Sequence, residues 1–115
     1  MYTHDIDYVI RTLGVGATYR GYRYLSYGIE LCLTDEEYLL AISKQLYPEI
    51  ARKYKTTVGS VERDIRTVIR VCWENGYDQL QSYSFRTLHV RPTAGEFFDI
   101  LVAYLSRNKP VLQAV

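Results

Sequence analysis

The stretch from Leu46 to Gly76 constrains the fold most, because it contains two amphipathic helical patterns separated by a short polar turn. Pro48 is suited to open the first helix, since a first-turn residue has no intrahelical partner for an N–H group. The turn is Lys55-Thr56-Thr57, and the hydroxyl of Thr57 can cap the second helix. These features predict a helix-turn-helix over about 46–76.

The second helix separates an apolar stripe from a polar surface. Its apolar residues recur at helical spacing and predict a buried stripe, namely Val61, Ile65, Val68, Ile69, Cys72 and Trp73. The opposite face carries polar and basic side chains: Ser60, Glu62, Arg63, Arg66, Thr67 and Arg70. An exposed, basic second helix is typical of a recognition helix that enters the major groove of DNA, here at about 58–75.

The rest of the chain predicts helices and no strand. Apolar spacing and capping signals indicate four further helices, at 6–13, at about 21–33, at 34–47, and from Thr93 to a stop at Asn108 and Pro110. The segment from Tyr77 to Val90 is polar and partly alternating, so we expect a loop or a short extended segment there. The predicted fold class is all-α, with about six helices.

The length of the chain and the distribution of its charges indicate a single domain with a basic segment. We expect residues 1–115 to form one domain with a single core. The net charge is only +1, but segment 30–43 has four acidic and no basic residues, whereas segment 44–70 has seven basic and three acidic residues. Such segregation can present a basic face to a partner. No signal peptide or membrane-spanning apolar run is evident, so we expect a cytoplasmic protein.

Catalytic and metal-binding patterns are not recognisable in the sequence. Cys32 and Cys72 lie in apolar helical patterns, without a CxxC motif, and we interpret both as buried thiols. His4 and His89 have no partners at the spacing of a metal site. Because there is also no nucleophile–base pair and no phosphate-binding glycine loop, we expect neither an enzyme nor a cofactor.

The strings LYPEIARKY, KTT and VGSVERDIR occur in this order, preceded by GYRYL and followed by RPTAGEF. From about Ile6 through Leu105, the chain resembles the C-terminal DNA-binding effector domain of sporulation-initiation response regulators of the stage zero sporulation protein A family. The resemblance implies an all-α domain that binds short, often tandem promoter boxes in double-stranded DNA and regulates transcription. It also implies contact with the RNA polymerase sigma subunit through the region between Trp73 and Pro92, and self-association on DNA.

In that family a phosphorylatable receiver domain normally precedes the effector domain. We recognise no receiver within the 115 residues. Two alternatives are open: the sequence is a domain of a longer regulator, or it is a stand-alone protein that is not controlled through phosphorylation of a receiver.

Site residues transfer from the family one position at a time. Members read bases with the Glu and Arg of VER, here Glu62 and Arg63, and with an Arg at the position of Ser60. The Arg after the next Ile is retained as Arg66, whereas Thr67 stands where a His is common. The resemblance therefore assigns base reading to Glu62, Arg63 and Ser60.

The chemistry of these side chains agrees with that assignment. An Arg such as Arg63 can donate two hydrogen bonds to guanine, a Glu such as Glu62 can accept one from cytosine, and Ser60 discriminates only weakly. The other polar groups of the turn and the helix are suited to DNA phosphates, which fix register without reading sequence: Lys55, Thr56, Thr57, Arg66, Thr67 and Arg70.

Other interpretations remain open. Glu62 and Arg66 are four residues apart and could simply form an ion pair along an exposed helix. Separately, the net charge near zero and the departures at Gly59 and Ser60 leave open a derived interaction module that does not bind DNA and pairs with another regulator. Tyr19, Tyr24 and Tyr27 could form an exposed aromatic patch, which would suit a protein interface.

Overall fold

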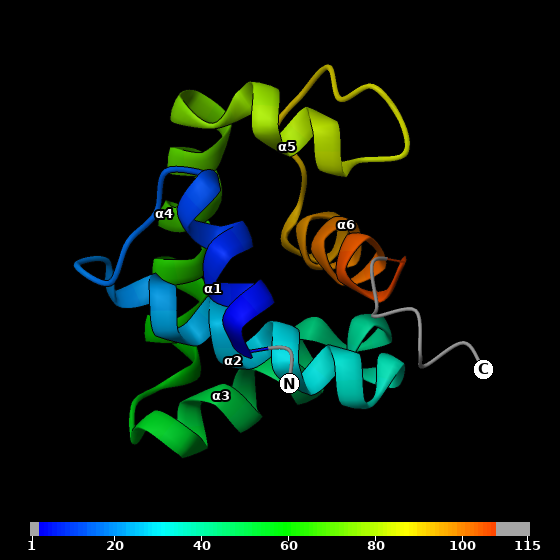
Figure 1. Ribbon diagram of the computed structural model, residues 1–115. Helices are drawn as coiled ribbons and strands as arrows, with labels where there is room; N and C mark the ends of the chain where they lie inside the picture. The colour runs from blue at the N-terminus through cyan, green and yellow to red at the C-terminus, as the bar shows by residue number, and fades with distance from the viewer. Residues whose placement is uncertain (1–2, 108–115) are drawn as a thin grey trace.

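The structure is a computed structural model that describes residues 3–107 (Figure 1). Within these residues no strand occurs, and six α-helices are present, which confirms the predicted all-α class. A 3₁₀-helix and a π-helix lie between the second and third α-helices. The elements in chain order are α1 (Thr3–Thr12), α2 (Arg20–Thr34), the 3₁₀-helix η1 (Glu36–Leu40), the π-helix η2 (Ile42–Leu46), α3 (Tyr47–Tyr54), α4 (Val58–Asn75), α5 (Tyr77–Tyr83) and α6 (Ala94–Arg107).

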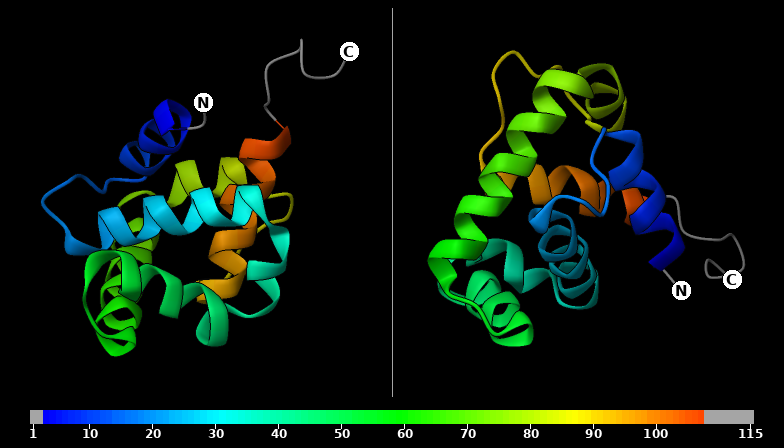
Figure 2. Two further views of the ribbon diagram at one scale, coloured as in Figure 1. Left: turned by 90° about the horizontal axis from the view of Figure 1, so that it is seen from below. Right: turned by 90° about the vertical axis from the view of Figure 1, so that its left-hand side faces the viewer.

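Helix α2 lies at the centre of the molecule. It packs against α1, α3, α4 and α6, and Figure 2 shows α1 and the α3–α4 pair on different sides of it. Its side chains Leu25, Ile29 and Cys32 are fully buried in a core to which α1, α4 and α6 contribute. Helix α4 runs along one edge of the molecule, which leaves one of its faces open to a partner (Figure 2).

Two of the predicted helix boundaries have the expected chemistry, and a third helix lies where it was predicted. Helix α1 ends just before Gly14, whose φ of +93° suits a glycine. Helix α2 covers the helix predicted at about 21–33. Helix α6 begins with a capping box, in which the Glu96 N–H donates to Thr93 Oγ1 at 3.2 Å and the Thr93 N–H donates to Glu96 Oε1 at 2.9 Å. The predicted stop at Asn108 and Pro110 lies outside the described residues.

The single α-helix predicted at 34–47 is wrong, because the segment forms a 3₁₀-helix and a π-helix instead. Thr34 is the last residue of α2 and not an N-cap. Asp35 caps the next element instead, because its carboxylate accepts a hydrogen bond from the Glu37 N–H at 3.0 Å. The chain then forms η1, breaks at Ala41 (φ −145°, ψ 60°) and forms η2, which runs into α3 without a gap.

Burial explains why a regular helix does not form there. Helix η1 buries no side chain, and Leu40 is 88% exposed although its spacing suggested a core position. Leu46, at the end of η2, is fully buried. The tighter turns of η1 and the wider turn of η2 change the register, so that Leu46 enters the core while the acidic start of the segment stays in solvent.

The segment from Tyr77 to Val90 also differs from the prediction, because its first half is helix α5. Leu80 and Tyr83 are buried, and the Tyr83 hydroxyl lies 2.6 Å from the Thr12 hydroxyl of α1. The apolar alternation that suggested an extended segment is not matched by burial, since Phe85 is 78% exposed. A helix of 7 residues held by a long-range contact has too short a pattern to identify from the sequence.

Candidate nucleic-acid interface

Helices α3 and α4 form the predicted helix-turn-helix. Ile50 and Ala51 of α3 are buried as expected, and α3 packs against α4. Lys55 adopts the left-handed conformation (φ 53°, ψ 50°) and turns the chain out of α3. This geometry buries one side of α4 and leaves the other side exposed at the edge of the molecule (Figure 1).

The apolar stripe of α4 forms its buried side. The stripe includes Val71 in addition to the predicted residues Val61, Ile65, Val68, Ile69 and Cys72. Trp73 was predicted to belong to it but is only half-buried. Its ring meets that of Tyr77 edge-on at a centroid distance of 5.0 Å, so it covers the core at the junction of α4 and α5.

The start of α4 is fixed by Thr57 and Ser60. The Ser60 backbone N–H donates to Thr57 Oγ1 at 3.0 Å, as expected for the predicted N-cap. The Thr57 hydroxyl in turn donates to Ser60 Oγ at 3.0 Å. Ser60 is half-buried and its side chain takes part in the cap, so it has less freedom to reach a base than the sequence suggested. Its role as a base reader stays a prediction.

Each of the three arginines on α4 is paired with a carboxylate of the same helix. The shortest contacts are 3.3 Å from Arg66 to Glu62, 3.4 Å from Arg63 to Asp64 and 3.4 Å from Arg70 to Glu74. The Arg63 and Arg66 side chains are nevertheless 60% and 65% exposed. The Arg66–Glu62 and Arg70–Glu74 pairs are exposed on both sides and contribute only about 0–1 kcal/mol, so a phosphate can displace the carboxylate at little cost. The partner of Arg63 differs, because the Asp64 side chain is only 15% exposed.

The other predicted contact residues differ in accessibility. Lys55 and Thr57 are exposed, whereas Thr56 and Thr67 are half-buried. The Thr67 hydroxyl donates to the Arg63 carbonyl oxygen at 3.2 Å and thus bonds to its own helix. The structure therefore brings the predicted residues to one end and one side of the helix-turn-helix, where Lys55, Thr57, Glu62 and the three arginines are exposed.

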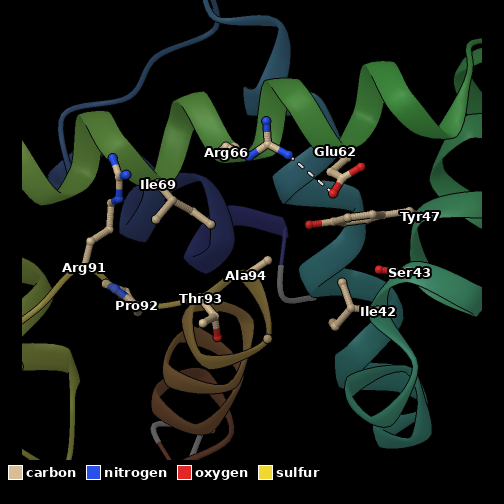
Figure 3. Close-up of a pocket in the computed structure, with 11 residues that line it drawn as sticks. Ile42, Ser43, Tyr47, Glu62, Arg66, Ile69, Arg91, Pro92, Thr93 and Ala94 are labelled. Carbon is tan, nitrogen blue, oxygen red and sulfur yellow. Dashed lines mark ion pairs between the residues drawn. The ribbon is translucent and has the colours of Figure 1, made fainter.

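A cavity of about 390 Å³ lies beside the recognition helix, between η2 and α3 on one side and the start of α6 on the other (Figure 3). Glu62 and Arg66 form its rim on α4, and Arg91 enters from the segment before α6. The buried Tyr47 lies in the wall below the Glu62–Arg66 pair. Burial raises the pKa of Tyr47 to about 12, with a further increase from Glu62 and a decrease from Arg66.

Sequence reasoning missed Tyr47 and Arg91 as parts of this surface. Both reach α4 from other elements, so no local spacing connects them with the recognition helix. The RPTAGEF string was visible in the sequence and contains Arg91.

An aromatic cluster joins α2 and α3, and it is not the exposed patch of tyrosines that the sequence left open. The ring of Tyr54 lies 5.4 Å from that of Tyr24 and 6.1 Å from that of Tyr27. Lys53 Nζ lies 4.9 Å from the centre of the Tyr27 ring, and the guanidinium carbon of Arg23 lies 5.6 Å from that of Tyr54. These tyrosines are half-buried and pack on the core, so the cluster ties α3 to α2.

The two cysteines are buried and unpaired, as predicted. Burial raises the pKa of each thiol to about 12, and Asp35 contributes to the shift of Cys32. Among residues 3–107 no group of three or more His, Cys, Asp or Glu side chains is placed to hold a metal ion. Within that same range, no helix is both long and apolar enough to cross a bilayer.

A comparison of the sequence with protein families gives one match that covers most of the chain. The family is described as sporulation initiation factor Spo0A, C terminal, and its model matches residues 6–105. The matched range extends from α1 to α6 and includes the helix-turn-helix and the cavity beside it.

Proposed function

Because this chain belongs to the Spo0A C-terminal family of sporulation initiation factors, we propose that it binds specific promoter boxes in double-stranded DNA and regulates transcription. The family is one of DNA-binding regulatory domains and not of enzymes. The observation that carries the finer proposal is the exposed face of α4, where accessible arginines stand on a helix whose other side is anchored in the core.

In the proposed complex the first half of α4 enters the major groove. Arg63 donates to guanine and Glu62 accepts from cytosine, while Ser60 contributes at most weak discrimination. Lys55, Arg66 and Arg70 bind phosphates. The hydroxyls of Thr56, Thr57 and Thr67 are weaker candidates for backbone contacts, because Thr57 and Thr67 already have hydrogen-bond partners in the protein.

The proposal extends to partners and cellular context. We propose that residues 1–115 act as one DNA-binding domain in the bacterial cytoplasm and that copies associate on tandem boxes. A single module buries only roughly 600–1,000 Å² on DNA, which favours paired sites. We further propose α5 and the following loop as the contact with the sigma subunit, because Phe85 and Val90 are large apolar residues exposed there.

The first test replaces the central base reader. We expect Arg63→Ala to lose about 1–3 kcal/mol of discrimination between the selected box and other sequences, because a bidentate contact to guanine is removed. The measurement is selection from a random duplex library, followed by titration of the recovered box. Arg11→Ala is the matched control, since Arg11 is an exposed, ion-paired arginine on α1. Unchanged specificity in Arg63→Ala would contradict the proposed mode of base reading.

A second candidate function is an interaction module that pairs with another regulator and does not bind DNA. The internal ion pairs of α4 and the net charge of +1 favour it. Salt dependence separates the two functions. For a DNA-binding domain, displacement of counterions from four or five phosphates predicts a slope of about −4 in a plot of log affinity against log salt concentration. For an interaction module, no duplex would show this salt dependence, and selection from a random library would yield no motif.

A further inference from the structure

The segment before α6 contains one residue without an evident structural role. Pro92 and Phe97 are buried, and Thr93 and Glu96 form the capping box of α6. These roles account for the other distinctive residues of the RPTAGEF string. Arg91 is exposed, and within residues 3–107 it forms no ion pair, hydrogen bond or aromatic contact.

The position of Arg91 links this segment to the recognition helix. Its side chain lines the cavity together with Arg66 and Glu62 of α4, and Figure 3 shows its guanidinium rising beside α4 near Ile69. The cavity wall thus contains two guanidinium groups and one carboxylate. Glu62 is already paired with Arg66 at 3.3 Å, so within residues 3–107 no carboxylate is paired with Arg91.

The direction from which Arg91 approaches α4 decides what it can contact on DNA. The major groove is about 12 Å wide, and an α-helix with its side chains is about 10–12 Å in diameter, so α4 fills the groove. A cation at the flank of the helix therefore meets the phosphate backbone at the groove wall and not the edges of the bases. Arg66 lies on the same flank and can share such a phosphate.

We propose that Arg91 binds a backbone phosphate beside the groove occupied by α4, so that the DNA interface includes the segment before α6 in addition to the helix-turn-helix. This inference rests on the proposed function. Loss of a phosphate contact weakens binding to all sequences to a similar extent and leaves the preferred motif unchanged. It also reduces the magnitude of the salt slope by about 1.

The test compares Arg91→Gln with Arg86→Gln in the full chain. Arg86 is a suitable control because it lies in the same connecting segment, is 65% exposed and is paired with Glu96, but does not line the cavity. Each variant is titrated at several salt concentrations with the selected box and with a scrambled duplex. Arg91→Gln should weaken binding to both duplexes and lower the magnitude of the salt slope. Arg86→Gln should leave the affinities and the slope unchanged. Arg91→Lys should restore the slope. Urea unfolding verifies that the variants are folded.

The outcomes distinguish this inference from the function on which it rests. An unchanged salt slope in Arg91→Gln, with specificity still lost in Arg63→Ala, would overturn the role of Arg91 and leave the proposed function intact. A change of preference at one base position in Arg91→Gln would overturn the assignment to phosphate in favour of a base contact. Failure of the unmodified protein to bind any duplex would overturn the proposed function itself, and this inference with it.

Discussion

At the scale of single residues, Thr57 determines where the recognition helix starts. Its hydroxyl accepts from the Ser60 N–H and donates to Ser60 Oγ, both at 3.0 Å. We expect Thr57→Ala to lower the free energy of unfolding by about 0.5–2 kcal/mol, because an N–H at the helix start loses its partner. Urea denaturation measures this change. Thr57→Ser keeps a capping hydroxyl and should remain near the original stability, and equal losses in the two variants would contradict the capping role.

Residue-level features were predictable where they depend on near neighbours in the sequence. The caps at Thr57 and Thr93 and the stripe containing Ile65 follow from spacings of three or four residues. The Glu62–Arg66 pair, left open as an alternative to DNA contact, is present at 3.3 Å. The cavity could not be predicted, because Tyr47 and Arg91 reach it from elements distant in the sequence, and only the tertiary packing places them beside α4.

At the scale of elements, the crossing of α2 and α4 depends on Gly21. A Cβ at this position would lie 2.4 Å from the Asp64 carbonyl oxygen and 2.4 Å from Val68 Cγ2. We expect Gly21→Ala to destabilise the protein by about 1–3 kcal/mol, since the two helices must separate. Gly59→Ala is the control, because a Cβ there has only Thr57 Oγ1 at 3.9 Å and should stabilise the helix by up to about 1 kcal/mol. Thermal and urea unfolding give both values, and a stable Gly21→Ala variant would contradict the close packing.

Helices with a repeated apolar pattern or a clear start signal were predictable, whereas α5, η1 and η2 were not. Helix α4, with 18 residues, repeats its stripe often enough to identify. Helix α5, with 7 residues, depends on the contact of Tyr83 with Thr12 of α1. The elements η1 and η2 have the apolar spacing of one regular helix, but the burial of Leu46 and the exposure of Leu40 require a different register. Tertiary packing, and not local preference, decides these segments.

At the scale of the whole molecule, the core determines the response to alkaline pH. Burial raises the pKa values of Cys32, Cys72 and Tyr47 to about 12. In the unfolded chain these groups ionise near their ordinary values, about 8.5 for Cys and 10 for Tyr. Above these values the unfolded state binds fewer protons than the folded state, so the free energy of unfolding should fall as pH rises towards 12.

Urea midpoints at about pH 8 and pH 10 measure this fall. Thiol alkylation at the lower pH is an independent measurement, and both cysteines should react only when urea unfolds the protein. Rapid alkylation of the folded protein would show that the thiols are not sequestered. Equal midpoints at the two pH values would contradict the proton linkage.

If the chain binds specific boxes as proposed, the ion pairs along α4 also affect the time that it spends on non-specific DNA. A genome offers about 10⁶–10⁹ competing sites, and attraction to any phosphate backbone holds a basic protein on them. Here the carboxylates of Glu62, Asp64 and Glu74 each offset part of the charge of a neighbouring arginine. Most chance encounters would not supply groups that replace these partners well. In the proposed function, the same pairs that weaken the basic face thus leave more of the protein free to find its specific sites.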